Sequence, residues 1–249
     1  MIRRISCALA LALVLSGNAH AQIRTFFGDD NPRSGSSNAF LARDTFFNAL
    51  TLRGTDDIES YGAFTPAPTL SFGATGITST TDVEFVAPFA QIAVSGTQLL
   101  LGRLGGDVQN PVPNLSDVFG LSSTVTAFGM FFTEVGDLGN QTTLSFVLEN
   151  TILSTSHNVN IGTFGTGRPN DALFFFGVTD TTPFNRVTLL KSTAGNLPDG
   201  ILFDDVTVGL AIVPEPSSLA LLGAGMGSAL VWWRRRRKAA SPRWNTARA

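Results

Sequence analysis

The chain between residues 22 and 212 predicts an all-β fold, an antiparallel β-sandwich of jelly-roll-like type with one short helix near its N-terminal end. Two observations predict it. The composition is rich in Thr, Ser, Gly and Phe, which favours strands and turns over helices. Short apolar runs also recur at separations of about 10 to 15 residues between Gly, Pro, Asn and Asp, as in antiparallel sandwiches.

The single helix is expected at the start of this region. Ser36-Ser37-Asn38 can cap a helix, and apolar residues follow at near-helical spacing, at Phe40, Leu41, Phe47 and Leu50. The five residues at positions 28–32, Gly-Asp-Asp-Asn-Pro, predict a turn before it.

The strands are predicted by alternation and by apolar runs. Residues 124–135 and 143–149 each place their large apolar side chains on one face, as a half-buried strand does. Residues 173–178 form a continuous apolar run that suits a strand buried on both faces. Further strands are expected at residues 186–190 and 201–208.

The dipeptide Phe-Gly recurs at irregular intervals, so it is not a structural repeat. Its phenylalanines are Phe27, Phe72, Phe119, Phe128, Phe164 and Phe176. We expect these rings to fill the core and the glycines to permit bends or bulges. The alternative is a stacking platform for sugar rings, which requires the rings to be exposed.

The N-terminus predicts a secretory signal peptide over residues 1–21. Arg3 and Arg4 form a basic start, residues 5–15 are apolar, and Ala19-His20-Ala21 precedes Gln22 as a small-x-small cleavage site. The lone cysteine, Cys7, lies inside this segment. A mature chain without cysteine excludes disulfides and thiol chemistry.

The C-terminus predicts a short membrane span with a basic stop. Residues 217–233 carry no charge, and 17 residues is about the lower limit for a helix that crosses a bilayer. Five basic residues that hold the tail on the cytoplasmic side follow the span: Arg234, Arg235, Arg236, Arg237 and Lys238. The motif Pro214-Glu215-Pro216 stands directly before the span, where the prolines keep the chain extended.

This tail resembles the PEP-CTERM sorting domain of Gram-negative bacteria, also known as the ice-binding protein C-terminal domain. The resemblance covers residues 213–238 and implies that Pro214, Glu215 and Pro216 are recognised by an exosortase, a membrane enzyme that cuts near the motif. It implies delivery to the cell surface or to an exopolysaccharide matrix. The alternative is an ordinary, permanent C-terminal anchor. The residues at 239–249 extend beyond the usual end of such domains and would form a short cytoplasmic tail.

The net charge of −2 hides a strong asymmetry. Residues 22–213 hold 18 acidic and 8 basic residues, a net charge of −10, whereas the tail is strongly basic. An acidic exported domain argues against binding of nucleic acid or of anionic polysaccharide by charge. Such a domain remains able to bind divalent cations.

Catalytic motifs are poorly supported. His157 is the only histidine after the signal, and its polar surroundings predict a loop or a strand end. A zinc site built from several His or Cys ligands is excluded, and neither a Gly-x-Ser-x-Gly elbow nor a phosphate-binding loop occurs. We expect Arg168 and Asp171 to form a loop salt bridge.

The neighbouring carboxylates Asp204 and Asp205 should point to opposite faces of a strand unless a bulge intervenes. Their strand, residues 201–208, resembles the closing strand of jelly-roll carbohydrate-binding modules. That resemblance implies a structural calcium ion held by Asp204, with Asp205 nearby, and more loosely by Glu59. The alternative is that these carboxylates bond nearby backbone groups. No other cofactor is expected.

The sequence thus predicts four segments: a signal peptide at 1–21, a β-sandwich at 22–212, a sorting and membrane segment at 213–238, and a tail at 239–249. We expect a non-catalytic structural, adhesive or glycan-binding protein of the surface or matrix. Its partners would be signal peptidase and the Sec translocon, the exosortase, the inner membrane before processing, and exopolysaccharide. Two alternatives are a secreted hydrolase of polysaccharides and an ice- or mineral-binding surface suggested by residues 78–81.

Overall fold

The computed structural model describes residues 22–31, 38–102, 114–136, 141–169, 172–194 and 200–212. They belong to one compact unit, His20–Ile212. Its helices are the α-helix α2 (Asn38–Asn48) and the 3-10 helix η1 (Gly73–Thr75). Its strands are β1 (Ile23–Asp30), β2 (Leu50–Asp56), β3 (Leu70–Ser71), β4 (Thr78–Thr81), β5 (Phe85–Ala87), β6 (Leu99–Leu101), β7 (Asn114–Thr133), β8 (Gln141–Asn150), β9 (Thr155–Phe164), β10 (Leu173–Ala194) and β11 (Leu202–Ala211).

The strands form a continuous antiparallel sheet in the order β5-β6-β11-β7-β10-β8-β9. Outside this path, β1 pairs with β10, β2 pairs with β11, and β4 pairs with both β3 and β7. Every described strand pair is antiparallel. The predicted all-β antiparallel fold is therefore confirmed.

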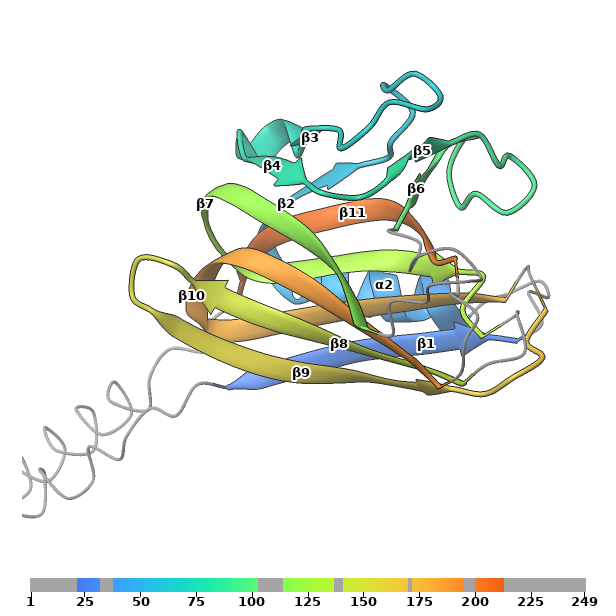
Figure 1. Ribbon diagram of the computed structural model, residues 1–249. Helices are drawn as coiled ribbons and strands as arrows, with labels where there is room; N and C mark the ends of the chain where they lie inside the picture. The colour runs from blue at the N-terminus through green and yellow to red at the C-terminus, as the bar shows by residue number, and fades with distance from the viewer. Residues whose placement is uncertain are drawn as a thin grey trace, which may run out of the picture. The chain divides into compact units, whose positions relative to one another are not determined.

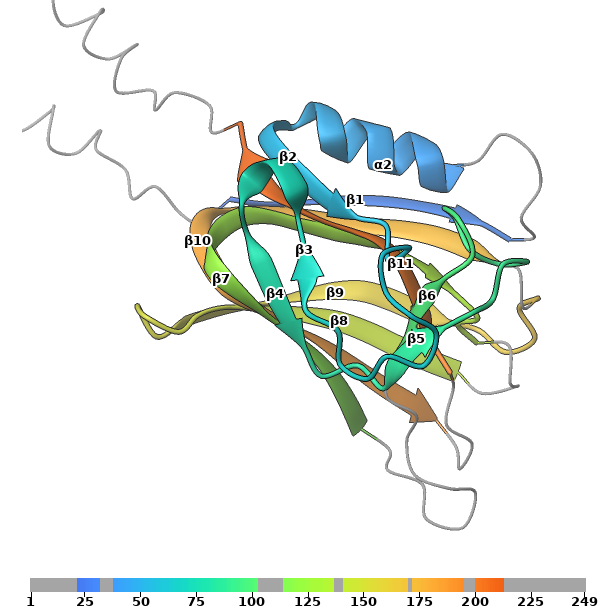
Figure 2. The same cartoon turned by 90° about the horizontal axis from the view of Figure 1, so that it is seen from above.

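The sheet folds over on itself because two of its strands are long enough to belong to both layers. β7 has 20 residues and β10 has 22. The first part of β10 pairs with β1, its last part pairs with β8, and the register shifts in between, around Phe184. Bulges bend a strand and increase its twist. Figures 1 and 2 show the result, a sandwich with α2 over one outer face and β8 and β9 on the opposite side.

Phenylalanine rings fill the space between the two layers. Phe132 stacks on Phe174 with ring centroids 4.6 Å apart, and Phe164 stacks on the same ring at 4.6 Å. The predicted faces are confirmed, since Leu144, Phe146 and Leu148 of β8 are all buried in this core. Their polar neighbours along β8 are less buried, as expected for a strand with one face turned outward.

The helix α2 docks on the outer face of the β1–β10–β7 layer, where glycines make room for it. Phe46 of α2 is fully buried and packs against Phe26 and Phe175. A Cβ atom at Gly177 would lie 2.8 Å from the Phe46 ring, and one at Gly129 would lie 3.1 Å from it. In the pairs Phe128-Gly129 of β7 and Phe176-Gly177 of β10, the phenylalanine ring therefore lies in the core of the sandwich, and the glycine leaves room on the outer face for the helix.

Several boundaries differ from the prediction. The expected turn at 28–32 begins too early, because β1 continues through Asp30 and uses this stretch to pair with β10. The separate strands expected at 173–178 and 186–190 are one bent strand, β10. The strand β9 was missed because its residues are mostly polar.

The terminal predictions fall outside the described residues. These are the signal peptide over 1–21, the membrane span over 217–233 and the tail over 239–249. In the part of the chain that the structure describes, no helix has the length and apolar character needed to cross a bilayer.

Candidate functional site

Three carboxylates hold the segment of residues 92–98 between β5 and β6, here called the 92–98 loop. The Asp204 Oδ2 atom accepts hydrogen bonds from the backbone N–H groups of Val94 at 2.7 Å and Ser95 at 3.1 Å. Glu59 Oε1 accepts the N–H groups of Thr97 at 2.7 Å and Gln98 at 2.6 Å. Hydrogen bonds to charged acceptors are stronger than neutral ones, so the loop is fixed at both ends.

A local irregularity of β11 brings Asp204 and Asp205 to the same loop. The pairing of β11 with β7 shifts register after Asp204, and Asp205 has a left-handed backbone with φ 47°. The Ser95 hydroxyl lies 2.7 Å from Asp205 Oδ1 and 3.4 Å from Asp204 Oδ1. The bulge needed to bring both carboxylates to one place is therefore present.

Burial favours the protonated, neutral form of the Asp204 and Asp205 carboxylates. Asp204 is fully buried, and desolvation together with the nearby charge of Asp205 raises the pKa of Asp204 to about 7, against the lowering effect of its N–H donors. Burial also raises the pKa of Asp205, although its bond from Ser95 and the charge of Arg43 act in the opposite direction. Asp204 therefore changes its charge near neutral pH.

The arrangement uses these oxygens for hydrogen bonds. Asp204 and Glu59 meet the loop at different residues, Val94 and Ser95 against Thr97 and Gln98. Among the residues with described positions, no group of three or more His, Cys, Asp or Glu side chains is placed to hold a metal ion. The backbone-bonding role is observed, and the calcium ion stays a prediction.

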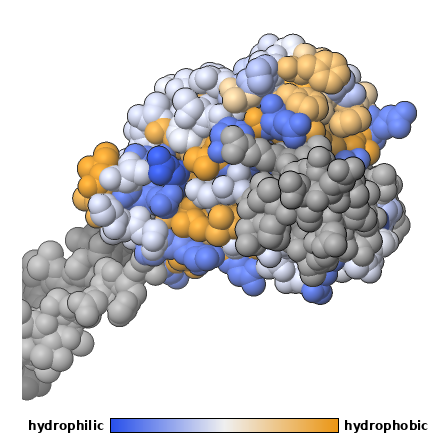
Figure 3. Space-filling model, viewed as in Figure 1, coloured by the Kyte–Doolittle hydropathy of each residue, from blue (hydrophilic) through white to orange (hydrophobic). Residues whose placement is uncertain are grey.

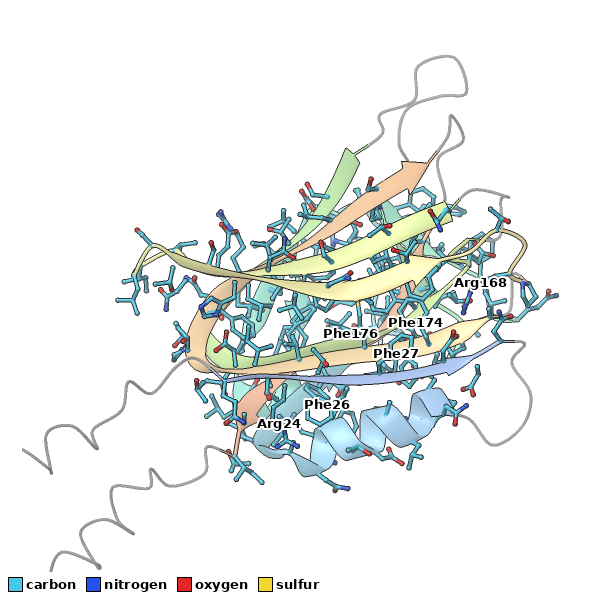
Figure 4. All side chains as sticks on the ribbon, turned by 90° about the horizontal axis from the view of Figure 1, so that it is seen from below. Arg24, Phe26, Phe27, Arg168, Phe174 and Phe176 are labelled. Atoms are coloured by element: carbon cyan, nitrogen blue, oxygen red, sulfur yellow. The ribbon has the colours of Figure 1, made fainter. Side chains whose placement is uncertain are left out.

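Phe27 is the exception among the Phe-Gly rings. Phe72, Phe119, Phe128, Phe164 and Phe176 are buried, so core packing is confirmed for them. The Phe27 side chain is 49% exposed, with its ring centroid 5.8 Å from that of buried Phe174. Figure 4 shows Phe27 beside Phe174 and Phe176, between β1 and the β8–β9 layer, while Phe26 points toward α2.

A charged pair lies on the same face of β1 as Phe27. Asp29 is two residues further along the strand, which places its side chain on that face. Both Asp29 oxygens bond Arg168, Oδ1 to Nη2 at 2.6 Å and Oδ2 to Nη1 at 2.9 Å. The Arg168 side chain is 9% exposed. The Arg168 Nε atom is buried and has no hydrogen-bond partner among the described residues. We call Phe27, Asp29 and Arg168 the β1-edge site.

The salt bridge observed for Arg168 is a long-range one, and the salt bridge predicted with Asp171 stays a prediction. Asp29 lies 139 residues before Arg168 in the sequence, and Asp171 lies outside the described residues. The guanidinium also stands over the Phe164 ring at 5.3 Å. These contacts hold the Arg168 side chain against β1 and against the Phe164 ring.

His157 lies near the start of a strand, as its polar surroundings predicted. It belongs to β9, and its Nδ1 atom lies 2.5 Å from Oδ2 of the buried Asp180. The other Asp180 oxygen accepts the backbone N–H of Thr182. Asp180 pairs in register with Ile23, the first residue of β1. The contact between His157 and Asp180 therefore lies at the opposite end of β1 from Asp29.

A shallow cleft of about 350 Å³ lies between β4 and the bend of β7 and β10. Its lining includes Thr78 and Thr80 of β4, whereas Ser79 and Thr81 of the same strand are buried. Two exposed threonines do not form the flat, regular array that an ice- or mineral-binding surface requires.

The residues after β11 carry the clearest functional signal. Residues 213–237 match the family model of the PEP-CTERM protein-sorting motif. This chain carries a PEP-CTERM motif. The recognition made from Pro214, Glu215 and Pro216 is confirmed, and the motif marks an exported, cell-surface protein that an exosortase-type enzyme processes. The motif covers only the C-terminal part of the chain and says nothing of what the sandwich binds.

Comparisons of the whole chain are less informative. No curated protein matches the sequence. The CBM22-1 xylan-binding domain of Paenibacillus barcinonensis Xyn10C is 12% identical over 66% of this chain and 96% of its own, with a TM-score of 0.33. The K2 cleaved adhesin domain of Lys-gingipain is 12% identical over 64% and 100%, with a TM-score of 0.39. Nothing about the ligand of this PEP-CTERM protein follows from similarity at that level.

Sequence reasoning found the carboxylates of the 92–98 loop but missed the β1-edge site. Asp204, Asp205 and Glu59 were nominated as calcium ligands through the resemblance to carbohydrate-binding modules. Phe27 and Asp29 were assigned to core packing and to a turn, because strand β1 was not recognised. The alternation of Ile23, Thr25 and Phe27 was the available signal.

Proposed function

We propose that the protein is an exported substrate of an exosortase and that its sandwich acts without catalysis at the cell surface or in an exopolysaccharide matrix. The signal peptide directs export through the Sec translocon, and signal peptidase cuts between Ala21 and Gln22. The apolar span at 217–233 then tethers the chain to the inner membrane until the PEP-CTERM motif is processed.

The position of the motif carries this proposal. The last strand in the described part of the chain, β11, ends at Ala211, and the Ile212 N–H donates to the Ala49 carbonyl oxygen at 2.8 Å. The matched motif begins at residue 213. A cut near Pro214 to Pro216 would therefore leave every described strand on the released side, so processing would free an intact folded domain.

The sandwich would act as a structural, adhesive or glycan-binding domain, and the β1-edge site is where we place a sugar contact. A half-exposed ring offers a face for the apolar side of a sugar. The Asp29 carboxylate beside it, which Arg168 holds in place, supplies an acceptor for hydroxyl groups. A neutral glycan suits this site better than an anionic one because the exported region is acidic.

A polysaccharide hydrolase would need two carboxylates facing an open cleft. Asp204 is fully buried, and both of its oxygens bond the 92–98 loop or its own strand. The neighbouring pair Asp204 and Asp205 therefore does not supply that arrangement, and we retain the non-catalytic proposal.

Mass spectrometry of the mature protein tests the sorting proposal. In cells with the sorting enzyme we expect the chain to begin at Gln22 and to end near the PEP-CTERM motif. In cells without it, the tail through Lys238 should remain. Identical C-termini in both strains would contradict the proposal.

Binding of the mature protein to an array of neutral glycans tests the sugar contact. We expect Phe27→Ala to abolish binding, whereas Phe89→Ala, which removes another half-exposed ring of 47% exposure, should leave it unchanged. Equal loss in both variants, or retained binding in Phe27→Ala, would move the contact away from the β1 edge.

A further inference from the structure

The turn between β8 and β9 exposes two adjacent large aliphatic side chains. Ile152 is 76% exposed and Leu153 is 63% exposed. Single exposed apolar residues are common on protein surfaces, but two neighbours at the tip of a hairpin form a small apolar point. Figure 3 shows this apolar cluster at the left edge of the molecule, where the β8–β9 turn projects in Figure 1.

Hydrogen bonds hold the tip in this exposed shape. The Asn150 Oδ1 atom accepts the N–H groups of both Ile152 and Leu153, at 3.1 and 2.9 Å. Asn185 Oδ1 accepts the N–H of Thr151 at 2.9 Å, and Asn185 Nδ2 donates to the Thr151 hydroxyl. Asn150 is itself buried and donates to the carbonyl oxygen of Pro183. These hydrogen bonds therefore keep the side chains of Ile152 and Leu153 exposed to solvent.

The tip lies at the end of the sandwich where the chain leaves toward the PEP-CTERM motif. The Ala211 N–H, at the end of β11, donates to the Thr126 hydroxyl at 2.7 Å. Next along β7, Val125 pairs with Phe184, whose neighbour Pro183 bonds Asn150. A continuous set of contacts thus joins the exit of the chain to the base of the hairpin, and Figures 1 and 4 show both at the same end.

Little chain separates this end from the apolar span. Four residues, 213–216, lie between Ile212 and the start of the span at Ser217. At about 3.3 Å per residue, an extended segment of this length reaches only about 15 Å. If the span enters a bilayer, the exit end of the sandwich is therefore held close to the membrane surface.

Charge near the tip does not oppose an approach to lipid. The carboxylate of Glu149 lies 4.0 Å from the Arg186 guanidinium, and Asp180 is buried against His157. The Arg186 side chain is 48% exposed, so an anionic headgroup can reach its guanidinium beside Glu149. Aliphatic side chains beside a basic one suit the boundary between headgroups and acyl chains.

We propose that Ile152 and Leu153 insert into the outer surface of the bilayer while the chain is tethered, so that the sandwich touches the membrane at two points. This inference rests on the membrane tether of the proposed function. Two aliphatic side chains alone bind lipid weakly, but the tether raises their effective concentration at the membrane. The contact would hold the sandwich in one orientation over the segment that the sorting enzyme cuts.

Fluorescence of the full chain in vesicles of phosphatidylethanolamine and phosphatidylglycerol tests this contact. The only native cysteine is Cys7, so Cys7→Ser gives a background for single labelling sites. An NBD dye at Leu153→Cys should be blue-shifted and at least about twofold brighter than a dye at Phe89→Cys, and lipid nitroxides should quench it. Both sites are exposed, so neither substitution disturbs the core.

The tether is measured separately in unlabelled protein. The sandwich contains no tryptophan: Trp232 and Trp233 end the span and Trp244 lies in the tail beyond it, so quenching by lipid nitroxides reports the C-terminal segment and not the sandwich. Quenched tryptophans with a water-exposed dye at position 153 would overturn the contact and leave the tether intact. Unquenched tryptophans would overturn the tether and the contact with it. A dye shift that needs the sorting enzyme in the vesicles would assign the tip to protein and overturn the lipid proposal.

Discussion

Asp204 on β11 accepts the backbone N–H of Ser95, which lies 109 residues earlier in the chain, at 3.1 Å. This single carboxylate joins the last strand of the fold to the 92–98 loop. Because it is fully buried and its pKa is raised, the bond connects the stability of the loop to pH.

Asp204→Asn should flatten the pH dependence of stability between pH 4 and pH 7. Burial raises the pKa of Asp204 from 3.8 to about 7 in the folded state, so the folded chain binds the proton more tightly than the unfolded chain. The contribution of Asp204 is therefore greatest below pH 4 and is lost as the pH rises through 7. Urea denaturation of both proteins across this range measures the slope, and an unchanged slope in the variant would contradict the assignment.

Glu59→Ala should release one end of the 92–98 loop. The change leaves the N–H groups of Thr97 and Gln98 without their charged acceptor, which costs roughly 1.5–3 kcal/mol. Limited proteolysis should then cut within the loop sooner than in the parent protein. Asp44→Ala removes a 57% exposed carboxylate on α2 and serves as the control, for which we expect an unchanged cleavage pattern.

Asp117→Ala should destabilise the protein strongly. The Asp117 carboxylate lies 2.8 Å from the Lys191 ammonium, and both side chains are almost completely buried. Removing one partner of a buried ion pair typically costs about 3–5 kcal/mol because a buried charge is left behind. The double variant Asp117→Leu with Lys191→Leu should recover most of this loss in the free energy of unfolding. A double variant no more stable than Asp117→Ala would show that packing, and not charge, sets the cost.

Gly28→Ala should loosen the contact between α2 and the sheet. A Cβ atom at Gly28 would lie 2.0 Å from the Asn38 carbonyl oxygen, at the start of the helix. Overpacking of this kind costs about 1–3 kcal/mol. Gly165→Ala is the matched control, because nothing lies within 4 Å of its Cβ position and the change should be nearly neutral. Thermal unfolding of the two variants gives the comparison.

Local pattern was enough to predict the apolar strands and the helix. Alternation located Phe128, Met130 and Phe132 on the core face of β7, and the capped apolar segment became α2. The layers could not be predicted in the same way. That β10 is a single strand shared by both layers depends on a register shift around Phe184, which tertiary pairing decides.

In the candidate site, too, local sequence pattern indicated individual residues but not the contacts between them. The sequence indicated Asp204 and Glu59 as candidate site residues. It has no pattern in the 92–98 loop from which the hydrogen bonds of these two carboxylates to the loop could be predicted. Asp205 takes a left-handed backbone that few residues other than glycine adopt, so the bulge could not be inferred. The partners Arg168 and Asp29 are 139 residues apart, and only the fold brings them together.

The position of β11 has a consequence for biogenesis. Of the described strands it is the last to be synthesised, yet it lies inside the sheet, where it pairs with β2, β6 and β7. The sheet cannot be completed until residues 202–211 are available, so cooperative folding has to wait for this strand. The sorting segment begins at residue 213, two residues after β11 ends. A polypeptide truncated within β11 or before it would therefore lack the sorting segment as well, so a chain that cannot complete its sheet would not be sorted to the surface.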